Sequence, residues 1–202
     1  MLTDQLRFQT YSDEVCAVSD PEKSKSYRKL FDELIPEKCS HELLLTVLRN
    51  LIDEQISIRN LPMIVEAISE SRLSDIQVAT EFVRQKLSRQ ILTTLRASNK
   101  IIPLLQLSPE WDEKLAAHQI ETPDGASDYA LPPEDFSKLV QNCRSAIERP
   151  AANWTNLTLI VPARRRRFLK NVLKAHGERL PMISFEELGF FKDASIVGTV
   201  DV

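Results

Sequence analysis

Three histidines and three cysteines are the side chains of this sequence best suited to hold a metal ion or to act as nucleophiles. They are widely spaced, at His41, His118, His176, Cys16, Cys39 and Cys143. No histidine has a second ligand three or four residues away, as helical metal sites need, so we expect surface or helix-end roles for them. The odd number of distant cysteines argues against a disulfide framework and favours free thiols in a reducing cytosol.

Nucleotide binding and catalysis have no supporting motif. The four glycines, at 125, 177, 189 and 198, do not form a loop that could cradle a phosphate, and no serine has the spacing of a nucleophile elbow. The acidic residues are distributed as on solvated helix faces. We therefore expect a protein that is not an enzyme and that uses no cofactor and no metal.

A run of four arginines, Arg164 to Arg167, is the most unusual local feature. On a helix these side chains point around a whole turn, so they cannot all face one phosphate backbone. Cations at a helix N-terminus are also disfavoured by the helix dipole, which suggests acidic neighbours or an acidic partner. Nucleic-acid contact is one interpretation, and a solvated, partly paired face is the favoured one.

The overall composition is that of an ordinary globular protein. The chain has 202 residues, of which 43% are hydrophobic, and 26 basic against 29 acidic side chains give a net charge of −3. The charges are spread evenly, so neither half is expected to bind a polyanion. Apolar runs are short, and we expect neither a membrane span nor a signal peptide.

Two apolar-periodic segments joined by a short elbow at residues 56–59 dominate the first half. Their stripes recur at three- and four-residue spacing, at Leu44, Val47, Leu48 and Leu51, then at Leu61, Ile64, Val65 and Ile68. Ser40 and Asn60 are placed to cap these helices, and Pro62 fits a first turn. A capping box at 74–77 predicts one long helix that continues to Leu95.

The remainder of the first half is less regular. A short helix from Tyr27 is ended by Pro36, and residues 2–18 fit a helix and a strand about equally well. Residues 21–99 are thus predicted to form an all-helical bundle after a lead segment at 1–20.

The pattern changes at residue 100. Short apolar runs predict strands at 101–107, 157–161, 182–185 and 194–200, with helices starting near Pro109, Pro132 and Ala163 and a loop at 121–129. This order predicts an α/β subdomain with a mixed sheet over residues 100–202, and an α+β class for the whole chain.

Several segments resemble, in register, the signature of the FHIPEP family, the export-gate proteins of flagellar and virulence type III secretion. The central segments read LRNL at 48–51, SIRNL at 57–61 and EAI at 66–68. Further matches read EFVR at 81–84, LSRQI at 87–91, LSPE at 107–110, LPMISFEEL at 180–188 and IVGTV at 196–200.

The resemblance implies a non-catalytic part of a protein-export gate. In that family the cytosolic part forms a nonameric ring on the cytoplasmic face of the bacterial inner membrane. The ring receives substrates, their chaperones and the export ATPase complex. Full-length members begin with a membrane region, so this chain would correspond to the last cytosolic subdomains.

Four charged residues match motif positions of the family: Arg59, Glu66, Arg84 and Arg89. One interpretation is that they form ion pairs within the bundle, each contributing under about 1 kcal/mol when exposed. The other is that they contact a neighbouring subunit, because the family's helical subdomain forms ring contacts. We predict the subunit-interface role.

A helical nucleic-acid-binding regulator is the alternative function, since helix, elbow and helix resemble a helix-turn-helix motif. That alternative predicts lysines and arginines on the second helix. The sequence there reads LPMIVEAISES, which is apolar and acidic and counts against it.

Overall fold

The computed structural model describes residue 29 and residues 39–71, 75–96, 101–121, 127–148, 156–189 and 191–202. The chain divides into two compact units, Met1–Leu87 and Ser88–Val202. The predicted boundaries at residues 20 and 99 lie outside the described residues, as do the predictions for residues 2–18 and for the helix between Tyr27 and Pro36, of which only Lys29 is described. The division into 1–20, 21–99 and 100–202 therefore stays a prediction.

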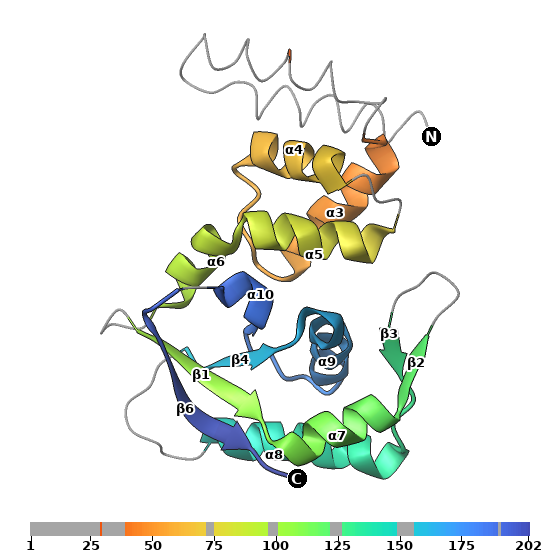
Figure 1. Ribbon diagram of the computed structural model, residues 1–202, viewed down its shortest axis with the longest axis vertical. Helices are drawn as coiled ribbons and strands as arrows, with labels where there is room; N and C mark the ends of the chain where they lie inside the picture. Colours follow the sequence, from red (N-terminus) through yellow and green to blue (C-terminus); the bar gives the residue numbers. More distant parts are fainter. Residues whose placement is uncertain are drawn as a thin grey trace. The chain divides into compact units, whose positions relative to one another are not determined.

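The first unit contains helices α3 (His41–Asp53), α4 (Leu61–Ser71) and α5 (Ile76–Lys86), with α5 packed against both of the others (Figure 1). The Ser40 hydroxyl accepts a hydrogen bond from the Leu43 amide at 3.2 Å, which confirms the predicted cap of α3. The predicted apolar stripes are buried and form the core, at Leu44, Val47, Leu48, Leu51, Leu61, Ile64, Val65 and Ile68.

The start of α5 differs from the predicted capping box. The cap is Asp75, whose Oδ1 accepts hydrogen bonds from the Gln77 and Val78 amides, both at 2.8 Å. Ser74, the predicted cap, lies outside the described residues. A short carboxylate can accept two amide protons at once, so Asp75 satisfies two of the free amides at the start of this helix.

The predicted long helix over 76–95 is interrupted at Leu87, and α6 (Ser88–Leu95) follows as a separate helix of the second unit. Leu87 at the break and Ile91 after it are both buried. Because the apolar period runs on through the interruption, the pattern gives no sign of it. Ser88, whose hydroxyl can compete for backbone groups, is the one local hint.

A four-stranded sheet organises the second unit. It is built from β1 (Ile102–Leu107), β4 (Thr158–Val161), β5 (Met182–Ser184) and β6 (Ala194–Val200), in the order β5-β4-β1-β6 with every pair parallel. These strands and the bundle confirm the predicted α+β class. Parallel and antiparallel pairing both occur, but in separate sheets.

The antiparallel pair is β2 (Gln119–Glu121) with β3 (Ser127–Tyr129), where the sequence predicts a loop over 121–129. Its registered pairs are Gln119 with Tyr129 and Ile120 with Asp128. Tyr129 is buried, and its ring lies 4.8 Å from that of Phe168 on α9 (Ala163–Ala175). Packing against a distant helix thus adds strand pairing to a segment that its turn-forming composition marks as a loop.

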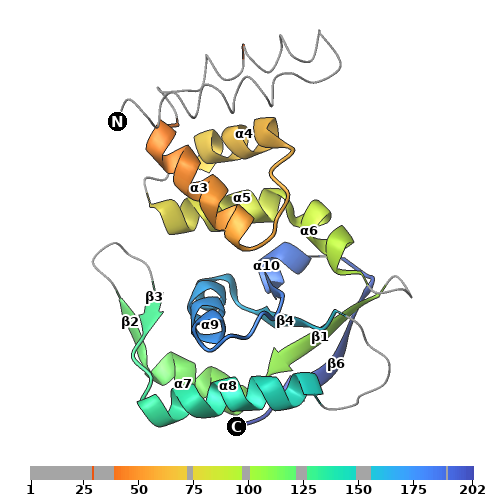
Figure 2. The same ribbon diagram turned by 180° about the vertical axis from the view of Figure 1, so that it is seen from behind.

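In the described part of the second unit, α6 and the sheet are accompanied by α7 (Pro109–Ala117), α8 (Pro133–Glu148), α9 and α10 (Phe185–Leu188). Helix α9 lies between the sheet and the β2–β3 hairpin (Figures 1 and 2). Helices α7 and α8 are joined by an ion pair between Lys114 and Asp135 at 2.6 Å. Helix α10 was not predicted, although Ser184 and Glu187 form a complete capping box there.

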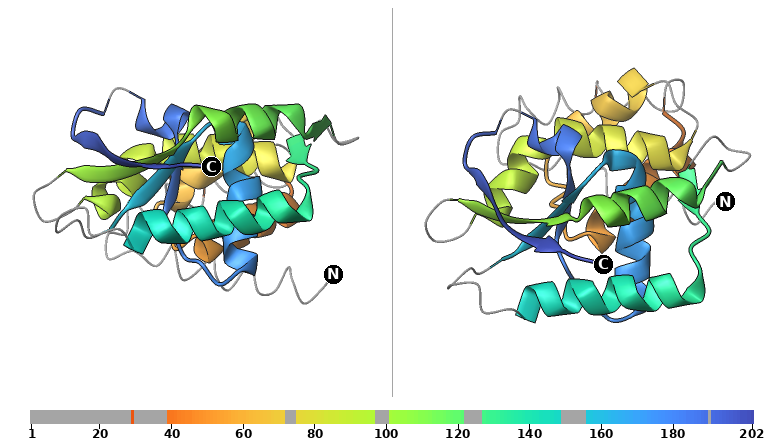
Figure 3. Two further views of the ribbon diagram at one scale, coloured as in Figure 1. Left: turned by 90° about the horizontal axis from the view of Figure 1, so that it is seen from below. Right: turned by 60° about the horizontal axis from the view of Figure 1, so that its bottom comes forward.

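The last strand, β6, approaches β1 closely at Gly198. A Cβ atom on Gly198 would approach Leu105 Cδ2 to 2.8 Å, so a larger residue at this position would require the Leu105 side chain to move. After the strand, the Asp201 carbonyl accepts hydrogen bonds from Trp111 Nε1 at 3.0 Å and Asn142 Nδ2 at 2.8 Å. Both views in Figure 3 show β6 running beside β1 along its length.

None of the helices in the described ranges is both long enough and apolar enough to cross a membrane.

Candidate protein-interaction surface

The elbow between α3 and α4 begins with a tight C-terminal cap. The Gln55 amide donates to the Ile52 carbonyl at 2.8 Å, and the Ile56 amide donates to the Leu51 carbonyl at 2.9 Å. This is the paired arrangement of a Schellman motif, in which the residue at Gln55 adopts a left-handed conformation, here with φ 59°. The motif reverses the chain so that residues 57–60 lead directly into α4.

An ion pair beneath this cap joins α3 to α5. Arg84 Nη1 lies 2.7 Å from Glu54 Oε2, and the two side chains are 2% and 16% exposed. A buried pair of this kind often adds little net stability, because desolvation of the charges offsets their attraction. Its geometry nevertheless fixes the end of α3 relative to α5, so Arg84 positions the elbow.

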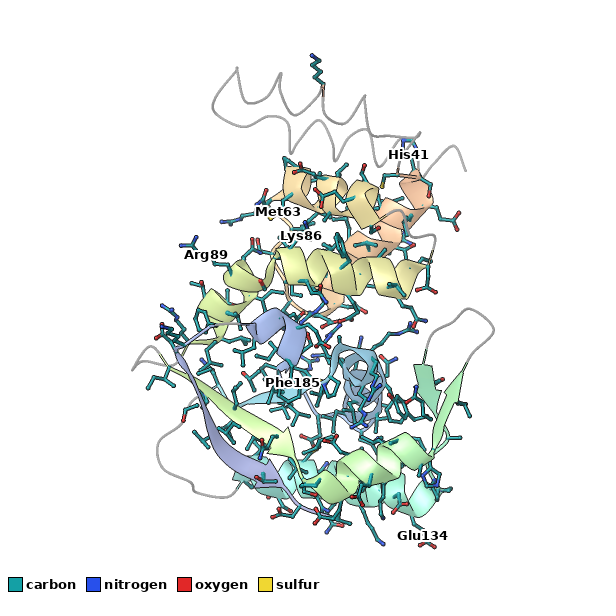
Figure 4. All side chains as sticks on the ribbon, in the orientation of Figure 1. His41, Met63, Lys86, Arg89, Glu134 and Phe185 are labelled. Carbon is teal, nitrogen blue, oxygen red and sulfur yellow. The ribbon has the colours of Figure 1, made fainter. Side chains whose placement is uncertain are left out.

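Three side chains at the start of α4 face solvent, and we call Arg59, Met63 and Glu66 the elbow surface. Met63 and Glu66 are three residues apart on α4 and are therefore neighbours. Met63 is 39% exposed, and Figure 4 shows it at the surface of this unit. The Arg59 amide donates to the Ser57 hydroxyl at 3.4 Å. The elbow surface thus combines an exposed cation, an exposed thioether and an exposed anion.

The four predicted interface residues thus have different surroundings. Arg84 forms an ion pair within its own unit, as the first interpretation of these residues expects. Arg59 and Glu66 are exposed on the first unit. Arg89, labelled in Figure 4, is exposed on α6 of the second. Their contact with a neighbouring subunit stays a prediction.

Sequence reasoning missed the role of Glu54, which lies 30 residues from Arg84. No local pattern could link the two residues. Met63 could have been found, because it lies off the apolar stripe of α4.

The exposed side of α4 is acidic. Glu66 and Glu70 are exposed, and Glu70 pairs with Lys86 of α5 at 2.7 Å. A recognition helix needs cations that reach phosphates and base edges. The structure therefore adds to the evidence against the helix-turn-helix alternative.

The arginine run is solvated and paired only in part, as the favoured interpretation expects, but two of its members are buried, which was not expected. Arg165 and Arg166 are only 4% and 1% exposed, whereas Arg164 and Arg167 are exposed. Arg165 forms an ion pair with Asp112 of α7 and donates to the Asp112 carbonyl at 3.1 Å. Acidic neighbours, which the helix dipole led us to expect, are thus present.

The histidines and cysteines were expected to have structural roles, and Cys16 lies outside the described residues. His118 and His176 are the C-terminal caps of α7 and α9, as expected of helix-end histidines. Burial raises the pKa of Cys39 to about 11 and that of Cys143 to about 12, so both thiols stay protonated near neutral pH. Within the described ranges, no three metal-binding side chains come together.

Comparison with known families finds that the FHIPEP family model matches residues 10–191. The flagellar biosynthesis protein FlhA of Caulobacter vibrioides is 27% identical over 83% of this chain and 24% of its own length. The secretion system apparatus protein SsaV of Salmonella typhimurium is 28% identical over 88% of this chain and 26% of its own length. The chain therefore spans about a quarter of the length of these curated relatives.

Solved structures share the fold. A cryo-EM structure of nonameric EPEC SctV-C has a TM-score of 0.75 at 20% identity and covers 96% of this chain and 61% of its own. The C-terminal domain of InvA has a TM-score of 0.76 at 21% identity and covers 89% and 55%. A complex of the Chlamydia pneumoniae CdsV and CdsO proteins has a TM-score of 0.69 at 24% identity and covers 90% and 52%.

Proposed function

The chain belongs to the FHIPEP family, and from this membership we propose that it is a cytosolic part of a type III protein-export gate, flagellar or virulence-related. The proposed role is a non-catalytic docking platform on the cytoplasmic face of the bacterial inner membrane. The match of the family model over residues 10–191 carries this proposal.

The solved relatives support an assembly role. One was solved as a nonamer and another in complex with a second protein, CdsO. By analogy we propose that this chain contributes to a homo-oligomeric ring. We further propose that the ring receives chaperone–substrate complexes and the export ATPase complex.

The elbow surface and Arg89 are the proposed ring contacts. A ring joins two different faces of each subunit, so each face must offer charges complementary to the other. Arg59, Glu66 and Arg89 are exposed charges that can meet this need, with Met63 as an apolar centre. Arg84 contributes indirectly, by holding the elbow from within.

Light scattering across a concentration series tests the ring contacts. We expect the chain to associate as its concentration rises and Arg59→Glu to raise the apparent dissociation constant at least tenfold, because reversal places like charges together. Arg49→Glu is the matched control, since Arg49 is an exposed arginine of α3 outside the elbow surface.

Two outcomes would overturn the proposed contacts. One is a chain that stays monomeric at every concentration, and the other is equal association of the Arg59 and Arg49 variants. Circular dichroism of each variant establishes that the bundle remains folded.

A further inference from the structure

Helix α9 separates its four consecutive arginines into two pairs. Arg165 and Arg166 point inward and are buried, while Arg164 and Arg167 point into solvent. The outward pair lies three residues apart, so the two guanidinium groups are neighbours on one face. Asn171 and Lys174 are exposed along the same face one and two turns further on.

The rotation of α9 about its axis is fixed from several sides. Arg165 is bound to Asp112, and Phe168 packs its ring 4.8 Å from Tyr129 and 5.8 Å from Phe136. Leu169, Val172 and Leu173 are buried in the core of the second unit. The outward pair is therefore held in place by the fold and does not need a ligand to orient its helix.

Two carboxylates of the chain already bind groups at the N-terminal end of α9. Asp112 binds Arg165, and Glu186 Oε2 accepts a hydrogen bond from the Ala163 amide at 3.1 Å. Within the part of the chain that the structure describes, no carboxylate forms an ion pair with Arg164 or Arg167. Among the described residues these two cations thus have no carboxylate partner, and Arg164 lies in the first turn of α9, where the dipole disfavours a cation.

We propose that the exposed face of α9 at Arg164 and Arg167 binds an acidic helical segment of another protein. Carboxylates three or four residues apart on such a helix match the spacing of the two guanidinium groups, which pair readily with carboxylates. Nucleic acid fits less well. Two exposed arginines are few for a polyanion, the chain carries a net charge of −3, and the half-buried Phe168 ring packs against Tyr129 and Phe136.

This inference adds a specific binding face to the proposed docking role, and its biological context rests on that proposed function. It is nevertheless independent of ring formation, because a peptide can bind to α9 of a single chain. Failure of the light-scattering experiment and failure of peptide binding are therefore distinguishable.

Fluorescence anisotropy with two synthetic peptides provides the test. Both are fluorescein-labelled alanine-based helices of identical composition. One has its glutamates on a single face at three- and four-residue spacing, and the other has them distributed around the helix. We expect the full 202-residue chain to bind the single-face peptide at least fivefold more tightly, with affinity falling as salt rises.

Substitutions locate the binding face. Arg164→Gln with Arg167→Gln should weaken binding of the single-face peptide at least tenfold. Arg49→Gln with Arg179→Gln removes two other exposed arginines and should change binding less than twofold. Because Arg164 and Arg167 are exposed, we expect unchanged circular dichroism for their variant.

Three results would overturn the proposal. Equal binding of the two peptides would show a response to charge alone, and equal loss in both double variants would place binding elsewhere. Tighter binding of a 20-base-pair DNA duplex, abolished by the Arg164 and Arg167 changes, would assign the face to nucleic acid instead.

Discussion

At the scale of single residues, Gln55 occupies a backbone conformation that suits glycine better. Its φ of 59° lies in the left-handed region, at the position of the Schellman motif where glycine is most common. A side chain there crowds the following carbonyl. The residue nevertheless has a clear role, because the reversal at Gln55 sets the direction of the elbow.

Gln55→Gly should stabilise the first unit by about 0.5 to 1 kcal/mol. Removal of the Cβ relieves the left-handed strain, and this gain exceeds the added entropy of the unfolded glycine. Urea denaturation followed by circular dichroism measures the change. The control is Gln85→Gly, at an exposed position within α5, which should destabilise by up to about 1 kcal/mol. The same sign at both positions would contradict this account.

Caps and buried arginines show what a sequence can and cannot reveal about single residues. Ser40 was predicted as a cap because a cap depends on neighbours along the chain. Ser74 and Asp75 are adjacent and both residue types are favoured as N-caps, so the sequence could not decide between them. The burial of Arg165 could not be predicted, because its partner Asp112 lies 53 residues away.

At the scale of elements, the Arg84–Glu54 ion pair connects α5 to the end of α3 inside the bundle. Removal of Arg84 leaves the Glu54 carboxylate, which is only 16% exposed, without this ion pair. We expect Arg84→Leu to destabilise the first unit by about 2 to 4 kcal/mol. Replacing both residues with leucine should cost less than the sum of the two single changes.

A double-mutant cycle from urea denaturation measures this coupling. The matched control is the Lys86–Glu70 pair on the same unit, which has the same 2.7 Å separation but side chains 45% and 49% exposed. Lys86→Leu should change stability by less than about 1 kcal/mol. Equal costs at the buried and the exposed pair would contradict the positioning role of Arg84.

Elements were predicted well where a run of residues encodes them and poorly where distant contacts decide. All four strands of the large sheet follow from short apolar runs such as 158–161. The order β5-β4-β1-β6 does not, because residue types alone leave open which strands pair. The shift in register between Leu104 and Leu105, which places Leu105 opposite Gly198, could not be predicted either.

At the scale of the whole molecule, each compact unit contains a buried cysteine that can report its unfolding. Cys39 belongs to the first unit and Cys143 to the second. Alkylation requires a thiolate, and burial raises the pKa of these thiols to about 11 and about 12. In the folded chain both should resist iodoacetamide at pH 8, since the folded state favours the protonated form and suppresses ionisation until much higher pH.

Pulsed iodoacetamide labelling in a urea series should give separate midpoints for the two cysteines. Each unit has its own core, and cores of different size lose stability at different denaturant concentrations. Mass spectrometry of the two peptides measures each midpoint. A single shared midpoint would contradict independent unfolding, and rapid labelling without urea would contradict the burial of the thiols.

The candidate site could be predicted in kind but not in detail. The motif residues around the elbow indicated a family and an interaction role, because family patterns record positions that many related chains share. They could not show that Arg84 points inward while Arg59 points outward. That difference arises from the packing of α5 against α3, which no spacing along the chain encodes.

The place of β6 in the sheet has a consequence for synthesis on the ribosome. Strand β6 is translated last among the strands, yet it pairs with β1, the first, with Ala194 opposite Ile102. During translation one edge of β1 therefore stays unpaired until residues 194–200 have left the ribosome. The helices of the first unit need no such delay, so the nascent chain should carry a finished bundle ahead of an unfinished sheet.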